Sequence, residues 1–392
     1  MSWKKVKFST LYEIPSRNGL TKPSRIRGSG YKMINMGELF ANSRIYDIPM
    51  ELVPLTDSEK INCKVERNDL LFARQSLVLE GAGKCSIVME TSSMTVFESH
   101  LIRVRLNLKK AYPPFYYYYF ASSLSPITSI VSQCAQAGIR GSDLGELYVD
   151  LPPVDTQHRI ADILSAYDDL IENNQKQIKL LEETAQRLYK EWFVDLRFPG
   201  HVHTKIVDGV PEGWKRRKLV DIAQVQYGYA FDGSLFNSQK IGTPIIRIRN
   251  IPQGQTEDYT PENVDSQYLV YNGDIIVGMD GEFHINTWAG DTAYLVQRTC
   301  RIKALTSDLN GFLLWAIYEP IKYFEKTVVG ATVAHLGKKH IDTVEILVPT
   351  EKFYLPFKSL FEARLLLMNQ NRALAEARDR LLPKLMSGEV EV

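Results

Sequence analysis

The stretch that decides the fold is residues 156–192, which read TQHRIADILSAYDDLIENNQKQIKLLEETAQRLYKEW. Apolar residues recur there at alternating intervals of four and three, which predicts a long helix with a coiled-coil seam. Asp155 or Thr156 can cap its start, and Phe198-Pro-Gly200 follows its end. The predicted seam is Ile160, Leu164, Tyr167, Ile171, Asn174, Ile178, Leu181, Ala185, Leu188 and Trp192.

A second helix is predicted over residues 356–386, with Pro356 in its first turn and a kink at Pro383. Its seam is Leu360, Ala363, Leu367, Gln370, Leu374, Ala377, Leu381 and Leu385. One constant shift places this seam on the first and Gln370 on Asn174. A polar residue inside a seam fixes the register and costs stability. We therefore predict antiparallel helices in which Asn174 contacts Gln370. The alternatives are that both side chains face solvent, or that each helix packs only on its own domain.

The segments outside the helices repeat once. Trp3-Lys-Lys-Val-Lys7 matches Trp214-Lys-Arg-Arg-Lys218, and Asn68-Asp-Leu-Leu-Phe matches Asn272-Gly-Asp-Ile-Ile. The offset between the copies shrinks along the chain, so the first copy carries an insertion. We expect four segments: domain 1 (1–153), helix 1 (154–198), domain 2 (199–349) and helix 2 (350–392). The predicted fold class is α+β, with two pseudo-repeated mixed α/β domains separated by two long antiparallel coiled-coil helices.

The domains themselves are dominated by short, β-rich runs bounded by Gly, Asn or Asp, such as residues 85–89, 101–106 and 274–278. The aromatic run Tyr116–Tyr119 could stack on nucleic-acid bases. It opens a predicted helix, however, and Phe312–Tyr318 occupies the same place in the second copy. We therefore interpret the run as core.

Composition and missing motifs exclude several functions. Basic and acidic residues nearly balance, at 47 and 46, so no blanket of positive charge is expected. No run of apolar residues is long enough for a membrane helix, and the start resembles no secretory signal. The four scattered cysteines, Cys63, Cys85, Cys134 and Cys300, suit free thiols in the cytoplasm.

Catalytic signatures are missing as well. Phosphate-binding loops and clustered carboxylates do not occur, and the Pro-Pro strings lack the polar residue that an amino-methyltransferase needs. His201-Val-His203 has no third metal ligand nearby in the sequence. We expect no catalysis by this chain, and no metal or cofactor bound to it.

Two related domains joined by helices suit two spaced half-sites on duplex DNA. The first domain begins with a basic arm (residues 1–27) and is basic on balance, whereas the second is slightly acidic. Arg side chains suit guanine, Asn and Gln suit adenine, and Asp can accept from cytosine. In the first domain the candidates are Arg17, Asn18, Lys22, Ser24, Arg25 and Arg27, expected in one loop, with Arg74, Gln75 and Arg140. In the second they are Arg247, Arg249 and Asn250, expected along a strand and its end, with Asp280 and Thr332. Asp280-Gly281 is aligned with Arg74-Gln75.

Three strings resemble the specificity subunit of Type I restriction–modification systems. They are Glu191-Trp-Phe-Val-Asp-Leu-Arg-Phe-Pro-Gly200, Gly209-Val-Pro-Glu-Gly-Trp214-Lys and Leu381-Leu-Pro-Lys-Leu-Met-Ser-Gly388. The resemblance covers the whole chain. It implies a non-catalytic cytoplasmic subunit that binds a bipartite, asymmetric double-stranded DNA target, one half-site per target-recognition domain.

The resemblance also implies partners. Two modification subunits would carry S-adenosylmethionine and methylate adenine N6, and restriction subunits using ATP and Mg could join them. Two alternatives stay open: a two-domain coiled-coil scaffold that binds no DNA, and an orphan specificity subunit that redirects another system.

Overall fold

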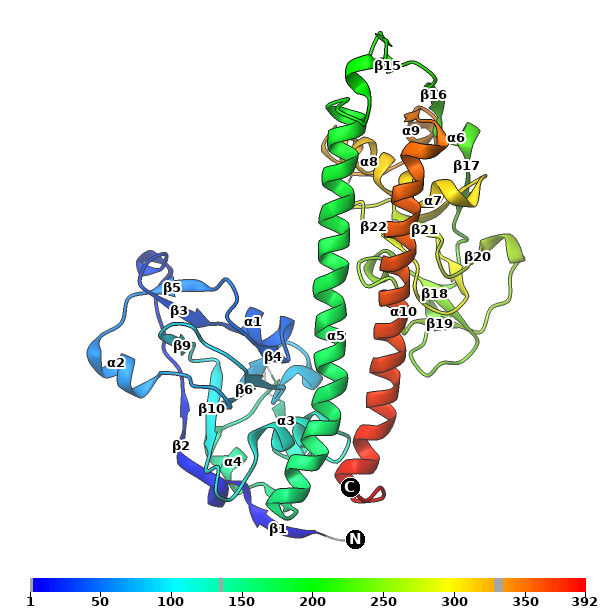
Figure 1. Ribbon diagram of the computed structural model, residues 1–392. Helices are drawn as coiled ribbons and strands as arrows, with labels where there is room; N and C mark the ends of the chain where they lie inside the picture. The colour runs from blue at the N-terminus through cyan, green and yellow to red at the C-terminus, as the bar shows by residue number, and fades with distance from the viewer. Residues whose placement is uncertain (1–2, 134–136, 328–333) are drawn as a thin grey trace. The chain divides into compact units, whose positions relative to one another are not determined.

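The computed structural model describes residues 3–133, 137–327 and 334–392. The chain divides into two compact units, of which unit 1 comprises Met1–Asp168 with Glu376–Val392 and unit 2 comprises Asp169–Ala375. The chain has two long helices, α5 (Val154–Tyr189) and α10 (Glu351–Ser387) (Figure 1). The start of α5 and the end of α10 belong to unit 1, and the rest of both helices belongs to unit 2. A short π-helical turn, Lys190–Val194, extends α5.

Unit 1 is built on a five-stranded sheet in the order β2-β10-β6-β8-β4, accompanied by the three-stranded sheets β5-β3-β9 and β11-β12-β7 and the pair β1-β13. Its strands are β1 (Lys4–Lys7), β2 (Tyr12–Asn18), β3 (Tyr31–Ile34), β4 (Arg44–Ile45), β5 (Glu51–Val53), β6 (Leu70–Ala73), β7 (Gln75–Ser76), β8 (Cys85–Val88), β9 (Thr95–Phe97), β10 (Leu101–Leu106), β11 (Ser132–Gln133), β12 (Ala137–Gly138) and β13 (Tyr148–Leu151). Its short helices are α1 (Met36–Ala41), α2 (Asp57–Asn62), α3 (Pro113–Ala121) and α4 (Gly141–Glu146).

Unit 2 has two four-stranded sheets, β17-β24-β21-β22 and β19-β18-β23-β20, and the pairs β16-β25 and β14-β15. Its strands are β14 (Ile206–Val207), β15 (Val210–Pro211), β16 (Lys215–Lys218), β17 (Ala223–Tyr227), β18 (Thr243–Ile246), β19 (Tyr259–Thr260), β20 (Leu269–Val270), β21 (Ile275–Gly278), β22 (Ile285–Thr287), β23 (Ala293–Leu295), β24 (Thr299–Ala304) and β25 (Glu345–Val348). Its short helices are α6 (Leu219–Ile222), α7 (Asn310–Ala316), α8 (Tyr318–Thr327) and α9 (Lys338–Ile341).

The two units repeat one strand pattern. In unit 1, β10 lies between β2 and β6, and β6 also pairs with β8. In unit 2, β24 lies between β17 and β21, and β21 also pairs with β22. A parallel pair, β3 with β9 and β18 with β23, recurs in the second sheet of each unit. The prediction of an α+β fold with two related domains and two long antiparallel helices is confirmed.

The repeat extends to the turn that leads into the central strand. Asp69 directly precedes β6, and Asp274 directly precedes β21. The residue before each of them, Asn68 or Gly273, has a positive φ, of 71° or 91° respectively. Gly and Asn are the residues that most readily adopt this left-handed conformation. Both copies therefore use the same tight turn to start the central strand.

Aromatic helices form much of each core. All aromatic side chains of α3, from Phe115 to Phe120, are buried, and so are Phe312 and Trp315 of α7. Tyr116 donates a hydrogen bond to the Asp150 carbonyl (3.1 Å), so its burial does not strand a polar group. The interpretation of the aromatic run as core, rather than as a base-stacking surface, is confirmed.

The long helices are antiparallel, because within unit 2 successive residues of α5 meet earlier and earlier residues of α10. Asn174 Nδ2 donates to Gln370 Oε1 (3.4 Å), and Arg364 Nε donates to Glu182 Oε1 (2.7 Å). The predicted contact between Asn174 and Gln370 is thus confirmed. The idea that each helix packs only on its own domain is wrong, since α5 adds Ala185 to the core of unit 2.

The seam predicted for α10 is partly wrong. Ala363, Gln370 and Ala377 are exposed, although Gln370 still accepts the bond from Asn174, and the inward positions one residue later are Arg364, which is buried, and Arg378, which is half-buried. The apolar pattern favoured the alanines because it could not foresee that acidic partners neutralise the two arginines. Among the other seam residues, Ile160, Leu164 and Asn174 are buried, whereas Ile171, Ile178, Leu181, Leu360, Leu367, Leu374 and Leu381 are half-buried.

The ends of α10 also differ from the prediction. The helix begins at Glu351, upstream of Pro356, because Phe353 and Phe357 are both buried in the core of unit 2 and extend the helical face. At its other end it continues through Pro383 to Ser387. The kink at Pro383 stays a prediction.

Candidate nucleic-acid interface

In unit 1, polar side chains gather where the central strand β6 ends. The Arg74 amide donates to the His100 carbonyl (2.7 Å), and the Arg74 carbonyl accepts from the Ile139 amide (2.9 Å). His100 Nδ1 donates to Gln75 Oε1 (2.8 Å). Because Arg140 follows Ile139, these backbone bonds bring Arg74, Gln75, His100 and Arg140 to one edge of the unit.

Two further candidates lie beside this edge. Arg17 and Asn18 are exposed at the end of β2, opposite Arg103 and Ile102 of β10. The next residue after Arg140 is Gly141, where an added Cβ would lie 3.3 Å from Ser16 Oγ. The structure thus brings together six residues that we name cluster 1: Arg17, Asn18, Arg74, Gln75, His100 and Arg140.

Arg17 and Asn18 belong to β2, whereas the other candidates from the start of the chain lie in the connection between β2 and β3, so the expectation of a single loop is wrong. Ser24 and Arg25 are exposed on a 3-10 turn, Ser24–Ile26. Lys22 forms an ion pair with Glu59 (2.8 Å) and retains only 10% side-chain exposure. Arg27 is paired with Glu51 (2.7 Å). Lys22 and Arg27 therefore each have an acidic partner within unit 1, and a DNA contact by either stays a prediction.

Unit 2 carries a second cluster at the equivalent strand end. The Met279 amide donates to the Arg298 carbonyl (2.9 Å), and the Met279 carbonyl accepts from the Leu336 amide (2.8 Å). These bonds repeat those of Arg74. Cluster 2 therefore consists of Asp280, Arg298 and His335, which occupy the places of Gln75, His100 and Gly138.

The side chains of cluster 2 contact one another and remain accessible. His335 Nδ1 hydrogen-bonds to Asp280 Oδ1, and Arg298 Nε lies 3.4 Å from Asp280 Oδ2. Arg298 is 53% exposed and has a φ of 69°, a conformation that costs a non-glycine residue energy. The cluster presents a carboxylate, a guanidinium and an imidazole, which are hydrogen-bonding groups suited to base edges and phosphates.

The predicted placement of Arg247, Arg249 and Asn250 along a strand is wrong. Strand β18 ends at Ile246, and a 3-10 turn, Ile248–Asn250, follows. Arg249 Nε donates to Asp258 Oδ2 (3.2 Å) and Asn250 Nδ2 to the same oxygen (3.1 Å). Burial alone would raise the pKa of Asp258, but these two donors outweigh it and hold the pKa below its usual range.

Arg247 is likewise engaged within unit 2. Its guanidinium lies over the Phe236 ring, 5.4 Å from the centroid, and its amide donates to Asn250 Oδ1 (2.8 Å). The alternation of apolar and polar residues was compatible with a strand, but the local hydrogen bonds favour the turn. The remaining candidate, Thr332, lies outside the described residues.

Sequence reasoning missed His100, Arg298 and His335. His100 and Arg298 each stand just before the long strand of the sheet, β10 or β24. Single residues at such positions give no local signal, and only an accurate alignment of the two copies could have selected them. The alignment was also displaced by one residue, because Asp280 corresponds to Gln75 and Met279 to Arg74.

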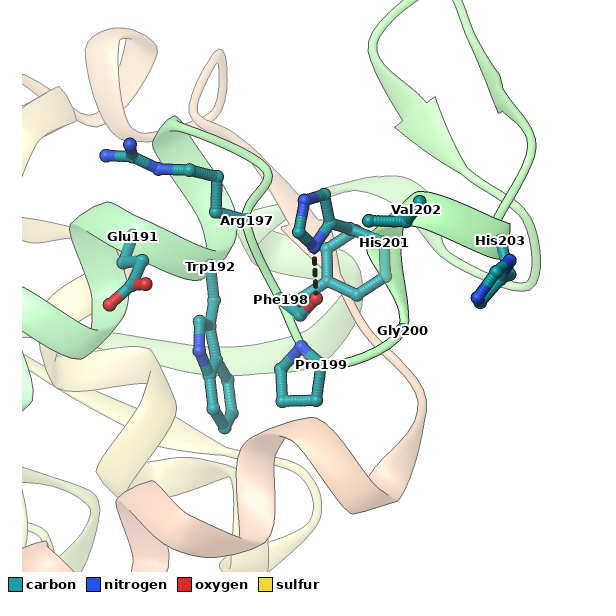
Figure 2. Close-up of a pocket in the computed structure, with 9 residues that line it drawn as sticks. All are labelled: Glu191, Trp192, Arg197, Phe198, Pro199, Gly200, His201, Val202 and His203. Atoms are coloured by element: carbon teal, nitrogen blue, oxygen red, sulfur yellow. Dashed lines mark hydrogen bonds between the residues drawn. The ribbon is translucent and has the colours of Figure 1, made fainter.

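The His201-Val-His203 segment lies beside a shallow pocket at the end of α5, lined also by Trp192 and Phe198 (Figure 2). His201 Nδ1 is 2.9 Å from the Phe198 carbonyl, and His203 lies apart from it across Val202. Within residues 3–133, 137–327 and 334–392, no group of three or more His, Cys, Asp or Glu could hold a metal. No helix in these ranges is long and apolar enough to cross a membrane.

Fold and clusters define a class of protein with two copies of one α+β domain, each with polar side chains at the same strand end. The family model for the Type I restriction modification DNA specificity domain matches residues 2–183 and 211–352. The chain belongs to this family.

Among its relatives is the Type I restriction enzyme MjaIX specificity subunit of Methanocaldococcus jannaschii, 28% identical over 272 residues. That alignment covers 65% of this chain and 63% of the relative, so it spans less than two thirds of the relative's length. The putative MjaX specificity subunit of the same organism is 23% identical over 401 residues, covering 96% of this chain and 91% of the relative. The crystal structure of a Type I restriction–modification S subunit from M. genitalium matches with a TM-score of 0.58 at 15% identity, covering 98% of this chain and 96% of that one; it shows the fold.

Proposed function

We propose that this chain is the DNA-reading, non-catalytic subunit of a Type I restriction–modification complex. Each unit would read one half of a bipartite, asymmetric duplex target. The observation that carries this proposal is the pair of clusters: they occupy equivalent strand ends but present different side chains, Arg, Gln and His in cluster 1 against Asp, Arg and His in cluster 2.

Different hydrogen-bonding groups at equivalent places are what an asymmetric target requires. Arg74 and Gln75 match guanine and adenine edges in the major groove, whereas Asp280 can accept from the cytosine amino group. Exposed Arg17, Arg25 and Arg140 would contact phosphates in a salt-dependent manner. Cluster 2 holds one arginine, Arg298, where cluster 1 holds three, so partner subunits would supply more of the contacts to the DNA backbone at the second half-site.

The proposal includes partners that do the chemistry. Two modification subunits would bind S-adenosylmethionine and methylate adenine N6 at the site that this chain selects, in the cytoplasm. Restriction subunits that use ATP and Mg would complete a full system. This chain would contribute recognition and assembly.

The test is single-molecule sequencing of N6-methyladenine in cells that express this chain with the modification subunit encoded beside it. We expect a methylated two-part motif that is missing when the chain is omitted. The modification subunit could methylate DNA with another specificity subunit but produce no new motif with this chain. That result would contradict the proposal and favour a scaffold. If the motif is methylated only when this chain is combined with the modification subunit of an unrelated system, the chain is an orphan specificity subunit.

A further inference from the structure

The inserted residues of the first copy lie beside cluster 1. In unit 1, Phe72 of β6 pairs with Cys85 of β8, whereas in unit 2 Val277 of β21 pairs with Ile285 of β22. The connection between the paired strands is therefore five residues longer in unit 1. It begins with Arg74 and Gln75 and thus grows directly out of the cluster.

The extra residues form an exposed apolar tip. Leu77 is 89% exposed, Val78 60% and Leu79 46%. Single apolar side chains are common on protein surfaces, but three consecutive ones at the end of a loop expose a contiguous apolar patch. In the described connection of unit 2, by contrast, Phe283 is buried and Glu282 is exposed.

The tip is held on a defined base. The Ala73 amide donates to the Lys84 carbonyl (2.9 Å), and the Gly83 amide donates back to the Ala73 carbonyl (2.8 Å). Within the loop, Ser76 Oγ accepts from the Val78 amide (3.2 Å), and the Val78 carbonyl accepts from Gly81 (3.2 Å). The apolar residues are thus presented by an ordered turn, and little conformational freedom remains to be lost on binding.

The strand end that leads to the tip is cationic and polar, and one exposed acidic residue, Glu80, follows the tip. Arg74 and Gln75 precede it, and Gln75 pairs with Gly138 of β12, two residues before Arg140. An apolar tip between arginines matches duplex DNA, which offers phosphates outside and apolar base faces inside the stack. A partner protein with an acidic rim is the competing occupant, but it would have to share the edge that carries the proposed base-reading residues.

We propose that Leu77–Leu79 is an apolar wedge that enters a base step at the first half-site and unstacks it. This inference rests on the proposed function. Architectural DNA-binding proteins insert Leu, Ile or Phe side chains in this manner and kink the duplex. Because the equivalent connection of unit 2 is short and its apolar residue is buried, the distortion is confined to one half-site. Flexible steps such as TA or CA at that place would be preferred, even where no side chain contacts their edges.

The test uses the full chain with its modification subunits and a duplex that carries the methylated motif. The adenine analogue 2-aminopurine, whose fluorescence increases when it unstacks, replaces each adenine of the first half-site in turn, on either strand. With the wild-type complex, the fluorescence of 2-aminopurine should rise several fold at one base step. Leu77→Ser should abolish that rise and weaken binding by about tenfold, which corresponds to about 1.4 kcal/mol. Ile61→Ser, at an 80% exposed apolar residue on α2, is the matched control and should change neither.

The outcomes separate the two proposals. If the wild-type complex binds no motif with salt-dependent affinity, the proposed function fails and the wedge with it. If it binds the motif but brightens nowhere outside the methylated adenine, or if Leu77→Ser leaves the rise intact, only the wedge is overturned. Loss of modification subunits from the Leu77→Ser complex, with an unchanged rise, would reassign the tip to a protein partner. The rise at the methylated adenine reports base flipping by the partner and is an internal control.

Discussion

Unit 1 and unit 2 agree in their buried polar framework and differ at the strand ends that it supports. Arg103 and Arg301 are both buried and pair at the same position of their sheets. Each guanidinium donates to a backbone carbonyl at an equivalent place, Lys64 in unit 1 and Leu269 in unit 2. The duplicated domain keeps the same interior polar contacts in both units, whereas the side chains at its exposed edge differ.

The long helices also carry one arginine–carboxylate pair in each unit. In unit 1, Arg378 of α10 bonds to buried Asp168 of α5, and in unit 2, Arg364 of α10 bonds to Glu182 of α5. Both pairs place the acid on α5 and the arginine on α10. The repeat aligns Asp168 with Arg364 and Glu182 with Arg378, so the two pairs use equivalent positions with the charges exchanged. The pairs also fix the antiparallel register, because a shift of one turn would leave an arginine without its acid.

The largest effect is expected from replacing the aspartates that directly precede the central strands. Comparing the two replacements tests whether the shared framework is equally important in both units. Asp69 accepts from Arg105 Nε and Nη2 at 2.7 Å each, whereas the cations nearest to Asp274 are 3.8 Å away. Asp69→Asn should reduce the free energy of opening of β6 by about 3 kcal/mol, because a buried pair loses one partner. Asp274→Asn should reduce that of β21 by about 1 kcal/mol.

Amide hydrogen exchange of the two strands measures these changes separately. Asp57→Asn, whose side chain is 93% exposed, is the control and should alter neither strand. Equal losses at Asp69 and Asp274 would contradict the different weights that the distances assign to them.

The next effect concerns the helix arginines. Arg364 is buried and donates to Glu182 (2.7 Å) and Asn286 Oδ1 (2.6 Å). Arg364→Ala should lower the stability of unit 2 by about 3 kcal/mol. Arg378→Ala should lower that of unit 1 by about 2 kcal/mol, since its side chain is 28% exposed and water can replace part of the pair.

Urea denaturation, monitored by amide hydrogen exchange in each unit, provides the measurement. Arg380→Ala is the matched control, because its side chain is 83% exposed and its pair with Glu376 is long, at 3.8 Å. It should cost less than about 0.5 kcal/mol. A loss at Arg380 as large as at Arg364 would contradict the weight that burial gives to the ion pair of Arg364.

The smallest effect concerns the polar contact within the seam. Asn174 is buried and its hydrogen bond to Gln370 is long, so the pair adds little stability. Asn174→Leu combined with Gln370→Leu should raise the stability of unit 2 by about 1 kcal/mol while weakening the register. Thermal denaturation measures the increase in stability. Asn173→Leu, at an exposed neighbouring position, is the control. A destabilised double variant would mean that the contact is a net contributor.

The sequence was sufficient for features that a repeated pattern encodes. Heptad spacing predicted both long helices and their meeting at Asn174 and Gln370, and the position of Tyr116–Tyr119 predicted a buried helix. It was insufficient where stability comes from a partner distant in the chain. Arg364 was not part of the predicted seam, since its partner Glu182 is far away in sequence, and the bond from Arg249 to Asp258 was not foreseen.

The candidate interface was predictable only in outline. Arg74, Gln75 and Asp280 stood out because they follow strongly apolar strands. His100, Arg298 and His335 reach the same edges through backbone hydrogen bonds between strands that are separate in sequence. Such pairings depend on the register of the sheet, and alternating apolar residues permit several registers.

The central claim, that each unit reads its own half-site, is tested most directly by methylome sequencing of two variants beside the wild-type chain. Gln75→Ala should relax or alter one base pair of one half-site and leave the other half-site unchanged, with a discrimination loss of about 1–3 kcal/mol at that position. Asp280→Ala should do the same to the opposite half-site. A change in both halves from either variant, or none from both, would contradict the account.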